Sequence, residues 1–339
     1  MKMKCGLVLA ALSSVVISSS AMAQENNEKN LTIENLSDSL VKMSSMDRLA
    51  DINNSGMSNM GSIALLTWRQ ENNDMNKRLS ELRESKGEVG IWTRITSGKS
   101  EFKSIENEYD SYQIGYDERL NNHWIMGGAV TYTEGKSFFS CGNGENKHKG
   151  FNGYLSYLGD DGSFVDLVAR YALLDHDFNV VNGAGSGNYD TNGYSLSAEY
   201  GKRFAKGNGY WVEPQVELTY GKVDSASYRG SNNVNIRQSA MESLVGRIGA
   251  VLGKNIKNGN VYVRASYLYD FDGEAAVTFV DNNSSKTYEQ NLGGGWFEVG
   301  VGTNLNMNNV THFYFDVEKT YGGEAVTPWQ WNAGVRCSF

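Results

Sequence analysis

Proline, cysteine and long apolar runs are scarce in this chain of 339 residues. It contains 2 Pro and 3 Cys beside 38 Gly, 19 Tyr, 13 Phe and 7 Trp. A high content of Gly and aromatic residues together with a low content of Pro disfavours a disordered or collagen-like chain. It favours a chain with many half-apolar strands. No run of about 18 apolar residues occurs, which excludes a helical membrane protein.

Positive charge is also scarce. Lys and Arg number 31 against 39 Asp and Glu, so the formal net charge is -8 at pH 7. The chain has no basic stripe that could follow a phosphate backbone, and nucleic acid is therefore not an expected partner.

The first residues have the pattern of a signal peptide. Two lysines precede a mostly apolar run over residues 6–17, and Ala21 and Ala23 are the small residues that a signal peptidase reads. The pattern predicts a signal peptide over residues 1–23, a mature chain that starts near Gln24, and export into a cell envelope.

Histidine and cysteine do not form a metal motif. The histidines fall near predicted strand ends without the spacing of metal ligands: His123, His148, His176 and His312. Beyond the signal peptide, Cys141 lies in a predicted loop and Cys337 in the last predicted strand, so the two are not expected to pair. We therefore expect neither a metal nor a cofactor.

From residue 88 onward one pattern repeats. About ten residues alternate between apolar and polar before a break of Gly, Asn, Asp or Ser, and a period of two is typical of β-strands. The last segment shows the apolar face most plainly: Trp329, Trp331, Ala333, Val335, Cys337 and Phe339. Twelve segments follow the pattern: 88–98, 108–119, 123–136, 149–159, 162–177, 190–204, 209–222, 237–253, 259–271, 289–304, 309–319 and 329–339.

The breaks between these segments alternate in length. Short breaks such as 159–162 and 206–209 take turns with long ones at 178–189, 223–236 and 272–288, which we expect to be loops. An even number of strands, with short turns on one side and long loops on the other, is typical of an outer-membrane β-barrel.

A soluble β-sandwich would also show alternating strands. Three features favour the barrel: aromatic residues gather near the strand ends, a signal peptide is present, and Phe339 ends a full alternating strand. Last strands that end on an aromatic residue resemble the signal read by the outer-membrane barrel-assembly machinery. The sequence therefore predicts an all-β membrane protein, a closed antiparallel barrel of twelve strands.

Upstream of the barrel the apolar spacing becomes that of a helix. The period is clearest from about Ile63 to Leu82, and Gly87 is a natural helix stop directly before the first strand. A helix of about 20 residues is about 30 Å long, enough to fill the polar lumen of a small barrel. Its charged residues are then expected to meet charges of the lumen wall: Arg69, Glu71, Lys77, Arg78, Glu81 and Arg83.

Several runs resemble the translocator domain of classical autotransporters. The start of that domain resembles three runs: Asn-Lys-Arg-Leu-Ser-Glu-Leu-Arg at 76–83, Gly-Glu-Val-Gly-Ile-Trp-Thr-Arg at 87–94 and Tyr-Gln-Ile-Gly-Tyr-Asp at 112–117. Its final hairpin resembles residues 318–323 and 332–339. The motifs fall in the family's order, and the resemblance covers roughly residues 60–339.

This resemblance implies an up-and-down barrel in the outer membrane of a Gram-negative cell, plugged by an N-terminal α-helix and exporting an N-terminal passenger by type V secretion. It divides the chain into a signal peptide at 1–23, a weakly structured or helical passenger or linker at 24–57, a pore-threading helix at 58–87 and the barrel at 88–339. Family members usually carry a long β-helical passenger. This chain therefore exports a small peptide, has lost its cargo, or is a trimmed form.

The likeness is greatest to the serine protease autotransporters of enteric bacteria, which release the passenger by cutting after an Asn in the pore helix. Aligned on residues 76–78, that Asn falls on Asn73. Its side-chain nitrogen would attack its own backbone carbonyl, close a five-membered imide and expel the amine of the next residue. Three acids match those that the resemblance implies as proton acceptors or relays: Asp166, Glu199 and Glu217.

A purely structural role for these acids is the alternative, because barrel lumens are polar and their charges also pair with a plug. Asp74 departs from the second Asn of the subgroup, which keeps the cyclising side chain but adds a charge. Beyond this single intramolecular turnover we expect no enzyme activity. The run Asp175-His176-Asp177 suggests the His–Asp pair of an omptin-like surface protease, but a solvated loop base is the favoured interpretation.

The predicted function is therefore that of an outer-membrane translocator, which anchors and exports its N-terminal segment to the cell surface. A passive pore for small solutes is the first alternative, and a surface adhesin or a remnant without its passenger is the second. The expected partners are outer-membrane lipid and, during assembly, periplasmic chaperones and the barrel-assembly machinery. The barrel is expected to be a monomer.

Overall fold

The computed structural model describes residues 49, 52, 59–83, 88–181, 184–281 and 284–339. The predicted signal peptide and nearly all of the predicted passenger or linker lie outside these residues. Among the described residues, no helix is both long and apolar enough to cross a membrane.

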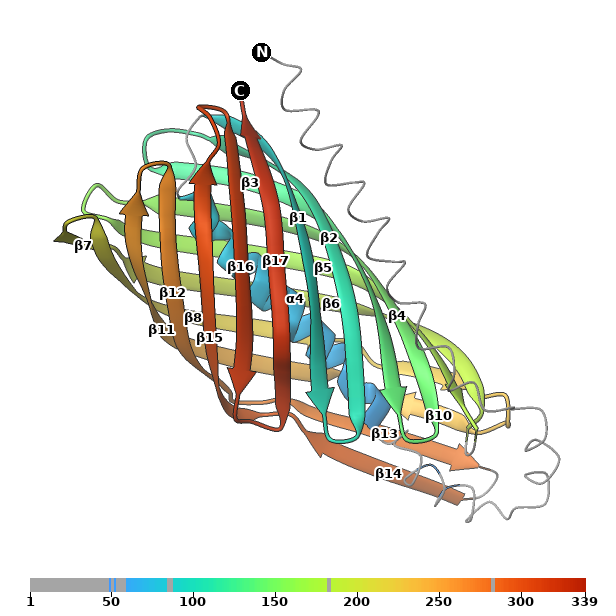
Figure 1. The fold of residues 1–339 in the computed structure, drawn as a ribbon. Coiled ribbons are helices and arrows are strands. Elements are labelled where there is room, and N and C mark those ends of the chain that lie inside the picture. The colour runs from blue at the N-terminus through green and yellow to red at the C-terminus, as the bar shows by residue number, and fades with distance from the viewer. Residues whose placement is uncertain (1–48, 50–51, 53–58, 84–87, 182–183, 282–283) are drawn as a thin grey trace, which may run out of the picture. The chain divides into compact units, whose positions relative to one another are not determined.

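Twelve antiparallel strands form a closed barrel (Figure 1). In chain order they are β1 (Val89–Phe102), β2 (Ile105–Arg119), β3 (Trp124–Phe139), β4 (Gly142–Leu158), β5 (Ser163–Val180), β6 (Ser186–Lys202), β8 (Tyr210–Val223), β11 (Met241–Ile256), β12 (Gly259–Asp270), β15 (Gly294–Asn306), β16 (Thr311–Tyr321) and β17 (Ala325–Ser338). Each strand pairs with its neighbour, and the pairing of β17 with β1 closes the ring. The short β7 (Phe204–Gly207) pairs with β8 alone. The predicted twelve-stranded barrel is confirmed.

The two faces of each strand differ as the alternation predicts. Leu167 and Leu218 are 41% and 51% exposed on the outer face, whereas their neighbours Asp166 and Glu217 face the lumen. Exposed apolar side chains recur around the outside of the barrel, among them Val130, Phe151, Leu196, Ile248, Val263 and Val301. The outer surface therefore suits lipid, and polar side chains line the inside.

Two of the long breaks are not loops. They contain β9 (Ala226–Arg229), β10 (Asn235–Gln238), β13 (Glu274–Asp281) and β14 (Ser284–Asn291), which form a second sheet in the order β14-β13-β10-β9. The third break is also shorter than expected, because β5 and β6 continue their ladder from Asn179 to Ser186. Expecting loops at 223–236 and 272–288 was wrong, because β9, β10, β13 and β14 pair with one another instead of entering the barrel ring. We call the end of the barrel that carries this second sheet the mouth.

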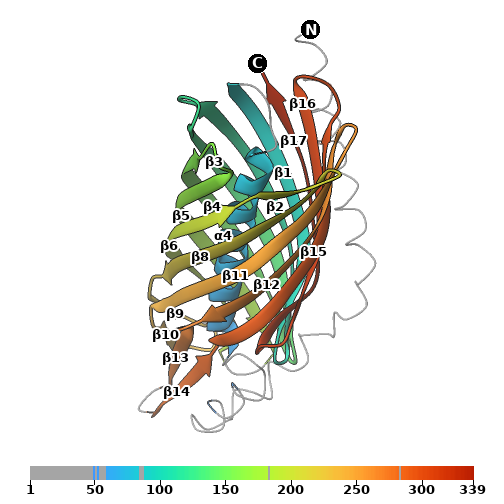
Figure 2. The same ribbon diagram turned by 90° about the vertical axis from the view of Figure 1, so that its left-hand side faces the viewer.

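Helix α4 (Met60–Leu82) runs along the inside of the barrel (Figure 2). At about 1.5 Å per residue its 23 residues are about 35 Å long. Near the mouth, Leu65 and Trp68 pack in an apolar cluster with Phe102 and Leu174. At the other end, which carries the short turns, a second cluster encloses the helix and the wall: Met75, Leu79, Leu82, Trp92, Ile125, Ala129, Tyr154 and Val168.

The seam between the first and last strands is bridged inside the lumen. Arg336 of β17 reaches over β1 and donates from Nε to Asp117 of β2 at 2.9 Å. Arg78 of α4 approaches the same carboxylate at 3.4 Å. Gly90 leaves the space for this crossing, since a Cβ there would lie 2.6 Å from Nε of Arg336. The closing strands and the helix therefore share one buried carboxylate.

We expect Gly90→Leu to weaken barrel closure, because its side chain would occupy the path of the Arg336 guanidinium. Losing one partner of a buried ion pair typically costs about 3–5 kcal/mol. The measurement is the temperature at which the folded barrel loses its fast mobility in SDS gels, which should fall. Ile91→Leu, on the outer face of the same strand, should leave that temperature unchanged. Equal values for the two variants would contradict a role for the Arg336 bridge.

Candidate functional site

The candidate site is the polar surface between α4 and the lumen wall. All six charged helix residues that were expected to meet lumen charges do so. The pairs are Arg69 with Asp270, Glu71 with His148 and Arg170, Lys77 with Glu298 and Glu318, Arg78 with Asp117, Glu81 with Arg94, and Arg83 with Asp166 and Glu213. These partners come from eight of the twelve strands, so the helix is bound from all sides.

Lys77 is held by two buried carboxylates at once. Its Nζ donates to Glu298 at 2.9 Å and to Glu318 at 2.5 Å. The side chains of Lys77 and Glu298 are each 1% exposed, and that of Glu318 is 3% exposed. Charges this deeply buried are tolerated only when they are paired, and removing one partner leaves the others uncompensated.

Asn73 faces a small cavity beside the helix. Its Nδ2 donates to Oε2 of Glu298 at 2.6 Å, and this oxygen also accepts the hydrogen bond from Lys77. The cavity has a volume of about 60 Å³ and is lined by Asn73, Glu217 and Glu298, among others. A cavity of this size can hold a water molecule where carboxylate and amide groups in its wall supply hydrogen-bond partners. Amide, carboxylate and room for a water molecule therefore meet at the one residue that was predicted to cyclise.

The three predicted acids lie in one row across adjacent strands. Asp166 of β5 is opposite Glu199 of β6, Glu199 is opposite Glu217 of β8, and Glu217 is opposite Arg247 of β11. The alternation of the sequence places all three on the lumen face, and the register brings them side by side. Arg247 contacts both Glu199, at 3.4 Å, and Glu217.

The row is not equally close to Asn73. Glu217 lines the same cavity but accepts its hydrogen bond from Asn76, at 2.5 Å. Asp166 binds Arg83, about three helical turns further along α4. Of the three acids, only Glu217 shares the cavity with Asn73, and all three have arginine partners.

Glu298 is the contact of Asn73 that sequence reasoning missed. Alternation along β15 could place it in the lumen, but no local signal distinguishes it from other lumen-facing acids. Its role depends on the height and rotation of α4 within the barrel. Those quantities are set by contacts between residues that are more than two hundred positions apart in the sequence.

The histidine near the outer end of β5 is placed differently from expectation. His176 faces the lumen, is 6% exposed and stacks on Tyr189 with ring centroids 4.8 Å apart. The interpretation as a solvated loop base was wrong, because β5 extends to Val180. Alternation along β5 puts Asp175 and Asp177 on the opposite face, so His176 forms no His–Asp pair with either neighbour.

The described residues contain no group of three or more His, Cys, Asp or Glu side chains that could hold a metal ion. His148 instead contacts the Glu71 carboxylate at 3.0 Å. Cys141, in the hairpin between β3 and β4, is a free thiol. The site therefore consists of amides, carboxylates and basic side chains.

Comparison with known proteins agrees with this geometry. The profile of the autotransporter β-domain family matches residues 89–318. The pertactin autotransporter of Bordetella parapertussis is 29% identical over 300 residues, which are 83% of this chain and 32% of that protein. The serine protease pet autotransporter of Escherichia coli is 29% identical over 283 residues, 79% of this chain and 22% of that protein.

A solved structure of an autotransporter barrel also has the same fold. The crystal structure of the β domain of the Bordetella autotransporter BrkA matches with a TM-score of 0.61 and 25% sequence identity, covering 74% of this chain and 99% of that domain. The chain spans about a third or less of the length of these curated relatives. We conclude that this chain belongs to the autotransporter β-domain family of outer-membrane barrels.

Proposed function

We propose that the barrel anchors in the outer membrane and exports the chain upstream of α4 through its pore to the cell surface. The observation that carries this proposal is the position of α4. Leu82 packs near the short-turn end of the barrel, where β1 begins, and Ile63 packs at the mouth with Ile105 and Phe139. In outer-membrane barrels the short turns face the periplasm and the longer loops face outward. A chain that leaves the helix N-terminus therefore emerges outside the cell.

A passive pore fits the lumen less well. An open pore has no use for buried carboxylates whose cationic partner lies on a helix inside the lumen. Glu298, Glu318 and Asp117 all face α4 and bind its basic side chains. The interior is therefore built to retain the helix, which supports a translocator whose pore is closed after export. No contact in the described residues favours an adhesin over this function.

The proposed surroundings follow from the two surfaces of the barrel. The apolar outer face suits outer-membrane lipid as its solvent, and the ring leaves no open edge in the membrane that would need a second copy. A monomer is therefore proposed. Periplasmic chaperones and the barrel-assembly machinery are proposed as partners during assembly, since an unfolded chain with this outer face would aggregate in water.

We further propose a single cleavage after Asn73 inside the pore. The side-chain nitrogen of Asn73 attacks its own backbone carbonyl carbon, the new bond closes the imide, and the peptide bond to Asp74 breaks. Glu298, at 2.6 Å, accepts the proton from Nδ2, and the departing amine of Asp74 gains a proton. Glu217 and the cavity supply the path for this proton. Glu199 and then Asp166 continue the relay along the row of lumen acids.

The plug predicts a low conductance that depends on Lys77. Replacing Lys77 by Met leaves Glu298 and Glu318 without their shared cation, a loss of about 3–5 kcal/mol for a buried pair. Single-channel recordings in planar bilayers should therefore show more frequent and larger openings than the wild type. Deletion of residues 60–82 should give the fully open level.

Lys222→Met is the matched control for this experiment. Lys222 also pairs with a carboxylate, Glu242, at 2.8 Å, but both side chains are about one-third exposed or more. Its loss should leave conductance unchanged. If the deletion conducts no better than the wild type, α4 does not close the pore.

Cleavage predicts a barrel that begins at Asp74. N-terminal sequencing and intact mass of the purified protein should give this start for the wild type and an upstream start for Asn73→Ala. Asn72→Ala is the control, because Asn72 accepts from Arg170 at 3.1 Å and is not the cyclising residue. Finding the wild-type start upstream of Asn73 would contradict the proposal.

Glu298 should set the rate of this cleavage. Glu298→Gln removes the proton acceptor, and loss of general base catalysis typically slows a reaction by about 10²–10⁴-fold. Glu318→Gln is the control, since Glu318 shares Lys77 with Glu298 but is not the carboxylate bonded to Asn73. The measurement is the time course of precursor conversion in pulse-labelled cells. Equal slowing in both variants would show that the two carboxylates act only through Lys77.

A further inference from the structure

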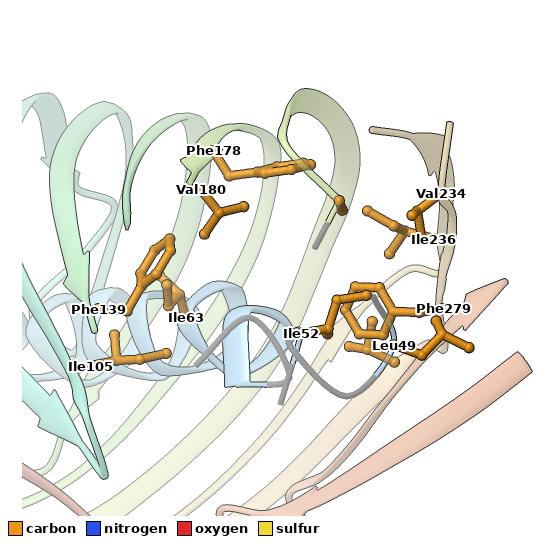
Figure 3. Close-up of a cluster of buried hydrophobic side chains, with 12 residues drawn as sticks. Leu49, Ile52, Ile63, Ile105, Phe139, Phe178, Val180, Val234, Ile236 and Phe279 are labelled. Atoms are coloured by element: carbon orange, nitrogen blue, oxygen red, sulfur yellow. The ribbon is translucent and has the colours of Figure 1, made fainter. Parts of the chain in front are cut away.

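The second sheet has an apolar inner face at the mouth of the barrel (Figure 3). Ile236 of β10 and Val277 and Phe279 of β13 are at most 3% exposed. Thr278, between the last two, is on the opposite face of its strand. The sheet is therefore amphipathic, and one of its faces is almost fully covered although it lies beyond the barrel ring.

Residues upstream of α4 provide part of that cover. Leu49 is 2% exposed and Ile52 is 0% exposed, and both belong to the same cluster as Ile236 and Phe279. The hydroxyl of Tyr288, on β14, donates to the backbone carbonyl of Leu49 at 2.7 Å. Side chains and backbone of the upstream segment are thus both bound by this sheet.

The opposite side of the cluster comes from the barrel wall. The hairpins of the first six strands contribute side chains that complete the cluster: Ile105, Phe139, Phe178 and Val180. Ile63 of α4 belongs to the same cluster and lies beside Phe139 and Ile105 (Figure 3). The upstream segment therefore joins the second sheet to the rim, and without it the buried faces of both would be open to water.

We propose that the sheet β14-β13-β10-β9 is a docking surface for the chain's own segment around Leu49 and Ile52, which holds the exported chain at the mouth. This inference rests on the proposed function, because the segment reaches the mouth by export. The occupant is fixed by the structure: two apolar side chains three positions apart enter the cluster, and Tyr288 binds the backbone beside them. Docking requires no covalent continuity with the barrel, so the segment would stay attached after a cut at Asn73.

The test is the reactivity of a cysteine at position 52. Ile52→Cys is placed in a Cys141→Ser chain, and the Cys141→Ser chain alone gives the background. Labelling by a membrane-impermeant maleimide is followed on intact cells and on the detergent-purified protein. Docking predicts slow labelling of Cys at 52. Adding Phe279→Asp should raise the rate by more than about tenfold, because a carboxylate is not tolerated in an apolar cluster.

Thr278→Asp is the matched control, on the outer face of the same strand, and should leave the rate near that of the parent. Folding of each variant is checked by the heat-dependent gel mobility of the barrel. If Phe279→Asp does not assemble, Tyr288→Phe removes only the hydroxyl that binds Leu49 and should still raise labelling several-fold. Fast labelling in the parent, or equal rates in a folded Phe279→Asp barrel, would overturn the proposal.

The two preparations separate docking from export. If the variants change labelling in the purified protein but intact cells are never labelled, docking stands and export to the surface fails. If intact cells are labelled equally with and without Phe279→Asp, export stands and docking fails.

Discussion

Buried charge is the constraint on which this molecule depends. The barrel is narrow and its lumen is polar. The helix inside it carries Lys77 and Arg78, and Arg83 follows directly after the helix; the side chains of all three are almost completely removed from water. Each would be prohibitively costly alone, so each must meet an opposite charge at close range. That requirement favours the observed height and rotation of the helix within the barrel, in which Lys77, Arg78 and Arg83 all have acidic partners.

The same constraint makes helix and barrel depend on each other. The helix has no side-chain cap at its first residue, no acidic residue in its first turn and no basic residue in its last turn. Its apolar contacts come from the wall, at Trp92 and Phe102 among others. Conversely, a wall without the helix would hold unpaired carboxylates. Because Arg78 and Arg336 share Asp117, the seam of the ring is completed by the helix as well as by the strands.

The sequence predicted what period and composition can determine. Alternation identified twelve strands and assigned Asp166, Glu199 and Glu217 to the lumen, and helical spacing identified the charges of α4. Period does not report register or rotation, so the contact of Asn73 with Glu298 was missed. Nor does it report which long segments pair with each other, and the short strands beyond the ring were therefore expected to be loops. His176 was misjudged for the same reason, since the end of β5 depends on its ladder with β6.

The position of Asn73 along the helix has a consequence for the fate of a cut chain. Upstream of it, Leu65 and Trp68 belong to one apolar cluster; downstream, Met75 and Leu79 belong to another. A cut after Asn73 divides the helix between these clusters, and each piece keeps its own buried contacts. Loss of the peptide bond alone therefore supplies no reason for the upstream piece to leave. Release would need the apolar contacts at the mouth to open as well, so the proposed cleavage and the departure of the cut piece would be separate events controlled by different parts of the barrel.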